Sequence, residues 1–267
     1  MNIKSACQNA PKPLCESVLR RLTNQALTMF LGEAANYEAA ARPGLQLALS
    51  NEAVADINML VVGAGANPDH FRGMVNLCKD RQLPFLVIIF PEANKSIDAV
   101  ATDLGLAYVV DFPFMVRDDF PLEPSGNPNV EVACASCGED AHASADVLVS
   151  AYQMPKNSVL RALPATLFDL PGIDVYVARE NGDVVGSVTL TYHGDICGIW
   201  AMATKASRQR DGIGLRLLST VISQQRNNKF RRFFLGSTPV GYHLYKKLGF
   251  ETVCLARIWV SGEAHQA

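Results

Sequence analysis

The sequence lacks the features expected of a membrane or secreted protein. No uncharged apolar run of roughly 18 residues or more occurs, so we expect no membrane-spanning helix. The stretch before Leu22 has no apolar core of the kind found in secretory signals. Seven cysteines are scattered without the spacing of a disulfide framework. Together these absences favour a cytoplasmic protein.

The sequence also lacks a recognisable metal-binding pattern. Cys134 and Cys137 form one CxxC, but no second CxxC or paired histidine motif accompanies it. The five histidines are scattered. We interpret "VEVACAS" as a strand with partly buried small residues rather than as part of a zinc site. We therefore predict no bound metal.

The net charge of the whole chain is close to zero, at −2. This balance argues against a general affinity for nucleic acid or for an anionic membrane. Positive charge is concentrated locally instead, where Lys205, Arg208, Arg210 and Arg216 crowd one stretch. A local patch of this kind indicates a small anionic ligand.

What the chain does have is enough apolar sequence for two domains. Apolar residues make up 49% of its 267 residues. The best linker is "DDFPLEPSGNPNV" (118–130), because it contains three prolines and few apolar residues. We predict an N-terminal domain over 1–120 and a C-terminal domain over 128–267.

Both halves show a mixed α/β pattern organised around a sheet. In the C-terminal half, strands are expected over 130–136, 173–192 (a hairpin), 196–204, 230–237 and 251–260, and helices over 140–152, 157–168, 214–228 and 240–249. In the N-terminal half, strands are expected over 57–65 and 84–90, a helix over 70–82, and a helix followed by a strand within 95–116.

One short similarity indicates an internal duplication. "ATDLGLAYVVDFPFMV" resembles "LYKKLGFETVCLARIWV", with Leu104-Gly105-Leu106 opposite Leu248-Gly249-Phe250. However, the first half has "GAGANPDHFRG" where the second has "QRDGIG", without the basic cluster. We therefore expect a non-catalytic first half without a phosphate site.

The stretch "QRDGIG" has the character of an anion-binding loop. It follows an expected strand and precedes an amphipathic helix, whose first N–H groups and dipole favour an anion. Glycine at 212 and 214 lets a phosphate approach the backbone. No lysine follows as in a Walker A loop, and Leu217 stands where a dinucleotide fingerprint requires glycine.

Two motifs in the second half resemble the GNAT superfamily of N-acetyltransferases. The loop Gln209-Arg210-Asp211-Gly212-Ile213-Gly214 matches [Q/R]-x-x-G-x-[G/A], and 244–250 match LYxKLGF in the expected order. The resemblance covers about Val130 to Val260. It implies an α/β fold of two tandem GNAT-like domains, each with a central mixed sheet flanked by helices, the first being degenerate.

The resemblance also implies a binding site for acetyl-CoA as co-substrate. Backbone groups of a splayed strand would pair with the pantetheine arm, and loop amides would bind the pyrophosphate. The residues at these positions are Met202, Ala203 and Thr204 on the strand, and Gln209, Arg210, Asp211, Gly212, Ile213, Gly214 and Leu215 in the loop. Lys205, Arg208 or Arg210 could meet the remaining phosphate or form a solvated face.

For the chemistry, the resemblance implies Tyr245 as the acid that protonates the departing sulfur, with Tyr242 as an alternative. A tyrosine packed on the apolar side of its helix is the other interpretation. The general base stays open, because "ICGIWAMAT" contains no carboxylate. Ser237 and Thr238 stand where many relatives have a coenzyme-binding asparagine.

Three functions remain open at this point. The first is an acetyl-CoA-dependent N-acetyltransferase acting on a small-molecule or protein amine, as a monomer or homodimer. The second is a non-catalytic acyl-CoA-binding regulatory protein. The third is an interaction scaffold. The intact phosphate loop argues against it, because a scaffold does not need such a loop. Asp140, Asp146 and Asp169 are candidates for meeting a cationic acceptor.

Overall fold

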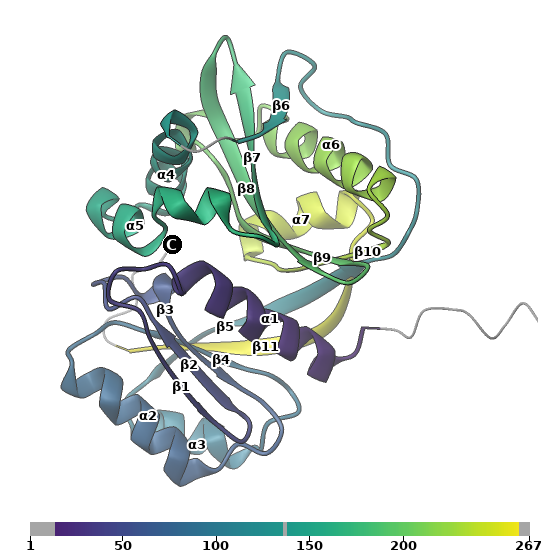
Figure 1. Ribbon diagram of the computed structural model, residues 1–267. Helices are drawn as coiled ribbons and strands as arrows, with labels where there is room; N and C mark the ends of the chain where they lie inside the picture. The colour runs from purple at the N-terminus through teal and green to yellow at the C-terminus, as the bar shows by residue number, and fades with distance from the viewer. Residues whose placement is uncertain (1–13, 136–137, 262–267) are drawn as a thin grey trace, which may run out of the picture.

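The computed structural model describes residues 14–135 and 138–261, which form a mixed α/β fold around one large sheet (Figure 1). The helices are α1 (Glu16–Leu31), α2 (Pro68–Asp80), α3 (Ser96–Asp103), α4 (Glu139–Tyr152), α5 (Lys156–Ala162), α6 (Ile213–Asn227) and α7 (Pro239–Lys247), with the 3₁₀ turns η2 (Ala55–Ile57), η3 (Ala165–Asp169) and η4 (Ala206–Arg208). The strands are β1 (Glu38–Arg42), β2 (Leu45–Leu49), β3 (Asn58–Val62), β4 (Leu86–Ile89), β5 (Ala107–Arg117), β6 (Glu131–Cys134), β7 (Ile173–Glu180), β8 (Asp183–His193), β9 (Ile196–Thr204), β10 (Arg232–Gly236) and β11 (Glu251–Val260).

The two halves of the chain exchange strands within this sheet. Its order is β1-β2-β3-β4-β11-β5-β10-β9-β8-β7-β6. β11 therefore lies between β4 and β5 of the first half, and β5 lies between β10 and β11 of the second. The division of the chain into 1–120 and 128–267 stays a prediction, while the sheet itself runs without interruption through both parts.

The internal repeat is visible in hydrogen bonds as well as in sequence. At the end of α3, Leu106 donates its N–H to Ala101 at 3.0 Å; at the end of α7, Phe250 donates to Tyr245 at the same distance. Gly105 and Gly249 both have a positive φ that favours glycine, as is common just after a helix. Each helix then leads into one of the two exchanged strands. The predicted pair of GNAT-like units is confirmed at the level of fold.

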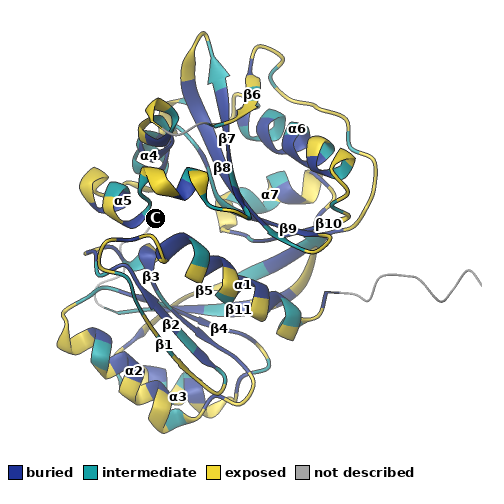
Figure 2. Ribbon diagram, in the orientation of Figure 1, coloured by how far each residue is buried: buried dark blue, intermediate teal, exposed yellow. Residues whose placement is uncertain are grey.

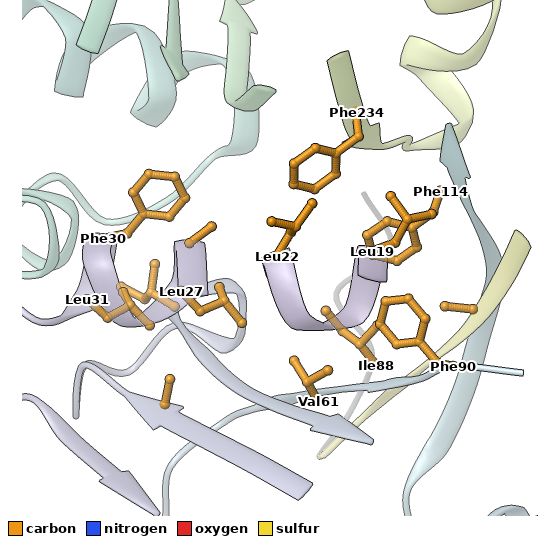
Figure 3. Packing of buried hydrophobic residues seen from close by; sticks show 14 of the residues in the cluster. Leu19, Leu22, Leu27, Phe30, Leu31, Val61, Ile88, Phe90, Phe114 and Phe234 are labelled. Carbon is orange, nitrogen blue, oxygen red and sulfur yellow. The ribbon is translucent and has the colours of Figure 1, made fainter. Parts of the chain in front are cut away.

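Helix α1 joins the two halves through its apolar face. Leu19, Leu22 and Phe30 are buried, and they belong to one cluster with Val61 of β3 and Phe234 of β10 (Figure 3). Phe30 meets Trp200 of β9 edge-on, with ring centroids 5.7 Å apart. Burial of apolar surface is the main driving force for packing, so α1 holds the halves together. By contrast, α2 and α3 expose their outer faces (Figure 2).

Several expected elements differ in detail from the structure. The helix expected over 157–168 ends at Ala162, and η3 follows, because Pro164 has no N–H to continue the helix. Residues 118–130 contain no helix or strand, but they pack against α6, where Ser125 donates its N–H to the Ser219 hydroxyl at 2.9 Å. Cys137 lies outside the described residues.

None of the helices within residues 14–135 and 138–261 combines the length and apolar character needed to cross a bilayer.

Candidate active site

The strands β9 and β10 separate to form an opening in the sheet. They pair in parallel only from Ile196 to Gly198 of β9. β9 continues to Thr204, whereas the end of β10 pairs with β5. In the described part of the chain, the last six residues of β9 therefore have no partner on the β10 side. Their backbone groups are available to a ligand.

A β-bulge turns this free edge toward the opening. The register between β8 and β9 shifts between Ser187 and Thr189, so Ala201 and Met202 share one opposing residue. Ala201 has a φ of 46°, which is unusual for alanine and accompanies the bulge. The Tyr152 hydroxyl donates to the Met202 carbonyl at 2.7 Å.

Along β9, the N–H and C=O groups of successive residues point alternately toward β8 and toward the opening, which identifies the residues that face the opening. Lys205 donates its N–H to Val185 of β8 at 2.9 Å. Neighbouring residues point in opposite directions, so the backbone of Thr204 faces away from β8. Ala203 pairs with Ser187 and has the opposite orientation to Thr204. Among the three predicted residues, we thus expect Thr204 and Met202 to contact the pantetheine arm.

The N-terminus of α6 lies uncapped next to this edge. Its N-cap, Gly212, has a φ of 76° and contributes no side chain. The N–H groups of Ile213, Gly214 and Leu215 find no acceptor in the described residues. In the first half, the matching helix α2 is closed, because the Asn67 side chain accepts from the N–H groups at positions 69 and 70. This contrast agrees with a phosphate site in the second half alone.

Gly214 is the point where the loop, β9 and α7 meet. A Cβ atom at this position would lie 3.1 Å from Met202 Cε, 3.3 Å from Leu244 Cδ2 and 3.7 Å from the Thr204 hydroxyl. The residues predicted from the strand and from the loop therefore do come together.

The basic side chains around the loop have different roles. Arg208 forms ion pairs with Glu180 and, at 2.9 Å, with Asp211. It is therefore already paired and serves to shape the loop. Arg210 is exposed, with a φ of 68°, and forms no ion pair within the described residues. Of the two, Arg210 is better placed to meet a phosphate.

Tyr245 is buried in α7 and belongs to a hydrophobic cluster against which Met202 of β9 packs. Its ring packs against Gly241, where a Cβ atom would lie 2.7 Å from Cε2, and edge-on against Phe250. Burial, followed by the nearby Tyr152, raises the pKa of the Tyr245 phenol. The hydroxyl has no hydrogen-bond partner among the described residues. A protonated phenol with a free donor is suited to protonate a leaving group.

The hydroxyls after β10 are engaged locally. Ser237 donates to the Thr238 carbonyl at 2.9 Å, and Thr238 caps α7 by accepting from the Gly241 N–H. The resemblance places both residues where a coenzyme contact is common. In the structure, Thr238 instead caps the helix that carries Tyr245, and Ser237 is bonded to the Thr238 carbonyl. In the described ranges, no three Cys, His, Asp or Glu side chains gather as metal ligands.

Comparison with known proteins agrees with this geometry. Residues 171–252 match the family model described as "Acetyltransferase (GNAT) domain". No protein of curated function matches the sequence.

Three solved structures share the fold at low identity. A GCN5-related N-acetyltransferase from Kribbella flavida has a TM-score of 0.66 and 17% identity, with 92% of this chain and 96% of that one covered. One from Sphaerobacter thermophilus has a TM-score of 0.58 and 16% identity, covering 82% and 76%. A tandem GNAT protein from the clavulanic acid biosynthesis pathway has a TM-score of 0.55 and 13% identity, covering 96% and 98%.

The family match includes β9, the loop and Tyr245, while the structural neighbours extend over both halves of the chain. The chain thus has the tandem GNAT fold, and residues 171–252 of its second half match the model of the GNAT acetyltransferase domain.

Proposed function

We propose that this protein is an acetyl-CoA-dependent N-acetyltransferase that transfers the acetyl group directly to a primary amine. The observation that supports this most strongly is the uncapped N-terminus of α6 next to the unpaired edge of β9. A helix N-terminus favours the pyrophosphate, and the free strand edge offers hydrogen bonds to the pantetheine amides. The N-terminus of α2 is capped by the Asn67 side chain, which supports one pyrophosphate site, in the second half.

The proposed reaction uses the groups around the opening. The amine nitrogen attacks the thioester carbonyl, and a backbone N–H from the free edge of β9 stabilises the oxyanion. The carbon–sulfur bond then breaks, and Tyr245 gives its proton to the departing thiolate. The proton that the attacking nitrogen loses restores the phenol, so the products are the amide and the coenzyme thiol. Holding both reactants in one opening lowers the entropic cost of their encounter.

Acetyl transfer tests this proposal directly. Release of the coenzyme thiol would be followed with acetyl-CoA and a panel of primary amines: spermidine, lysine, kanamycin and a lysine-containing peptide. The panel includes small molecules and a peptide, because both acceptor classes are open. Acetylated product formed by the wild-type chain supports the proposal. If acetyl-CoA binds but no amine is acetylated, the non-catalytic acyl-CoA-binding function is favoured instead, consistent with the lack of a carboxylate on β9.

A further inference from the structure

The segment that connects the two halves, residues 118–130, runs along α6 from its end to its beginning (Figure 1). Near the end of α6, Asp119 pairs with Arg226 at 2.7 Å and with Arg231 at 3.1 Å. Midway along the helix, the Ser219 hydroxyl donates to the Ser125 carbonyl at 3.1 Å. We call residues 118–130 the strap, because these contacts hold it against the helix along its length.

The strap reaches the anion-binding loop at Gly126 and Asn127. Asn127 donates its backbone N–H to the Gly212 carbonyl at 3.3 Å. Gly126 has a φ of 102°, and a Cβ atom there would lie 2.5 Å from the Gly212 carbonyl oxygen and 2.7 Å from the Arg216 nitrogen. Both are backbone atoms, so this close approach requires glycine. The strap therefore touches the N-cap of α6, directly before the three open N–H groups.

The Asn127 side chain holds the other side of the loop through two ion pairs. Its amide nitrogen donates to Glu180 Oε1, at the end of β7, at 3.1 Å. The second oxygen of Glu180 pairs with Arg208, and Arg208 Nε pairs with Asp211 Oδ2 at 2.9 Å. The Glu180 side chain is only 12% exposed, and such an enclosed, charge-assisted network is stronger than the same bonds in water.

Two carboxylates that the sequence offered for a cationic acceptor are also paired within the second half. Asp140 pairs with Arg179, and Asp146 pairs with Lys156 at 2.6 Å. Glu180 differs from both, because its cationic partner belongs to the anion-binding loop. Its pairing therefore carries the position of the strap to the loop.

The conformation of Asn127 is itself fixed by a local turn. Its side-chain oxygen accepts from the Asn129 N–H at 3.0 Å, and its backbone carbonyl accepts from the Val130 N–H at 3.3 Å. An asparagine side chain that bonds to the backbone two residues on stabilises a turn. With the bonds to Gly212 and Glu180, both backbone polar groups and both side-chain polar atoms of Asn127 are engaged.

The loop depends on such support because its backbone is unusual. Arg210 and Gly212 both have a positive φ, of 68° and 76°. The N–H groups of Ile213, Gly214 and Leu215 can bind one pyrophosphate only while this conformation is kept. A site that is already in its bound shape loses less free energy to ordering when the ligand binds.

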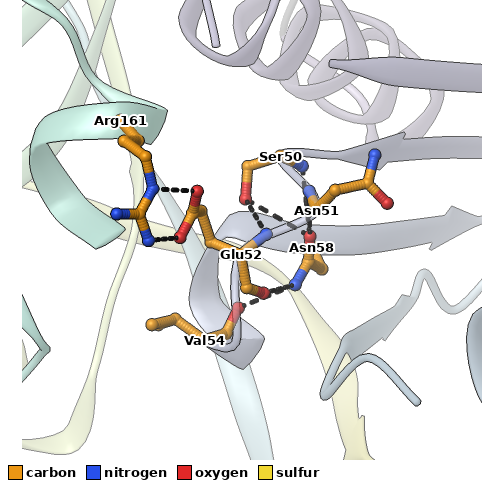
Figure 4. Close-up of polar contacts among 6 residues, drawn as sticks. All are labelled: Ser50, Asn51, Glu52, Val54, Asn58 and Arg161. Atoms are coloured by element: carbon orange, nitrogen blue, oxygen red, sulfur yellow. Dashed lines mark hydrogen bonds and ion pairs between the residues drawn. The ribbon is translucent and has the colours of Figure 1, made fainter. Parts of the chain in front are cut away.

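A second contact between the halves involves neither the strap nor the loop. At the turn between β2 and β3, Glu52 accepts two hydrogen bonds from Arg161 of α5, at 2.6 and 2.5 Å (Figure 4). The Asn58 side-chain oxygen makes this turn rigid by accepting from the N–H groups of Ser50 and Asn51, at 3.1 and 3.2 Å (Figure 4). This contact allows the stability of the chain to be changed separately from the loop.

We propose that Asn127 of the strap is a positioning residue, which holds residues 208–215 in the shape that binds the coenzyme pyrophosphate. It acts through the Gly212 carbonyl and the Glu180 carboxylate. The inference rests on the acetyl-CoA binding that the proposed function includes. It gives the connection between the two halves a role in the affinity for the coenzyme.

The test compares Asn127→Ala with Asn129→Ala, an exposed residue of the same strap. We expect Asn127→Ala to raise the Kd of acetyl-CoA by about 10-fold in calorimetric titrations, since a hydrogen bond to a charged group contributes on this scale. The kcat at saturating acetyl-CoA should not change. The kcat/KM with S-acetylpantetheine, which has the pantetheine arm but no phosphate, should change by less than about 2-fold. Asn129→Ala should behave like wild type.

Two further variants separate loop position from folding. In Asn127→Ser, the hydroxyl can still accept from the Asn129 N–H but is too short to replace the amide at Glu180, so the same rise in Kd is expected without loss of the turn. Glu52→Gln weakens the contact in Figure 4 and should lower the melting temperature while leaving the Kd of acetyl-CoA unchanged.

The other outcomes overturn the inference. An unchanged Kd in both Asn127 variants leaves the proposed function standing but removes the positioning role. An equal loss with S-acetylpantetheine, or a fall in kcat at unchanged Kd, assigns Asn127 a role outside the pyrophosphate loop. If wild type binds acetyl-CoA but acetylates no amine, the catalytic part of the proposed function fails, and the Kd values still decide this inference. A wild-type chain that does not bind acetyl-CoA contradicts the proposed function first, and this inference with it.

Discussion

Phe112 of β5 pairs with Ala256 of β11, and these two residues are 144 positions apart in the sequence. The same separation relates Gly105 to Gly249 at the ends of α3 and α7. The pairs on either side, Asp111–Arg257 and Pro113–Leu255, obey the same relation. A shift of 144 positions takes Asp111 to Leu255 and Pro113 to Arg257, so each pair is converted into the other. An approximate two-fold axis therefore passes between Phe112 and Ala256. The two halves are related as subunits of a dimer would be.

The isolated second half should dimerise. Residues 128–267 lack β5, which leaves a vacant position between β10 and β11. Unpaired strand edges readily form hydrogen bonds with a strand of another chain. Because the halves are related by a two-fold axis, β11 of one copy can occupy the vacant position between β10 and β11 of a second copy. We expect light scattering after size exclusion to give twice the mass of the fragment. A stable, fully folded monomer would contradict the account of strand exchange.

Removal of the Tyr245 hydroxyl should affect turnover more than binding. We expect Tyr245→Phe to lower kcat by about 10²-fold or more while the Kd of acetyl-CoA stays constant, since general acids contribute on this scale. Tyr108→Phe, at an exposed tyrosine of β5, is the control and should change kcat little. Because the pKa of Tyr245 is raised above its ordinary value of about 10, the acid form persists through neutral pH. Unchanged kcat would assign Tyr245 a packing role only.

Loss of the Asn58 amide should destabilise the whole chain. The side chain is fully buried and forms hydrogen bonds with five backbone groups. Asn58→Ala leaves those groups unsatisfied, so we expect the free energy of unfolding to fall by about 2–4 kcal/mol in urea titrations. The exposed Asn94→Ala should cost less than about 1 kcal/mol. An equal effect of both would contradict the importance of the turn.

The contact between Glu52 and Arg161 should give a pH-dependent contribution to stability. Hydrogen bonding to Arg161 lowers the pKa of Glu52 in the folded chain. The contribution is therefore fully present above the unfolded pKa of about 4.3 and is lost as the pH falls through the folded pKa. Glu52→Gln should melt a few degrees below wild type at pH 7. That difference should shrink below pH ~4, as followed by circular dichroism; a constant difference would contradict the ion-pair account.

The sequence was sufficient for the local features of the second half. The loop at 209–214 and the helix around Tyr245 carry local patterns, because an anion site and a helix end depend on neighbouring residues. The hairpin over 173–192 and the order of elements around it are also confirmed.

Features that depend on long-range contacts were missed. The exchange of β5 and β11 joins residues far apart in the chain, which no local pattern encodes. Helix α1 was also not predicted, although its apolar residues recur at helical spacing. Tyr152 carries no motif, and only the fold brings its hydroxyl to the Met202 carbonyl on the free edge of β9.

Calorimetric titration with acetyl-CoA tests the central claim most directly. Wild type should bind, whereas Gly212→Glu and Gly214→Asp should lose binding, because each places a negative side chain at the open N-terminus of α6. Gly214→Asp is the second variant, because an aspartate in the first turn favours the helix. Its Cβ atom would lie 3.1 Å from Met202 Cε and 3.3 Å from Leu244 Cδ2, so the melting temperature of each variant is measured alongside binding. Gly73→Glu, on an exposed face of α2, is the control and should bind like wild type. Equal binding by wild type and the folded Gly214→Asp variant, or no binding by wild type, would contradict this account.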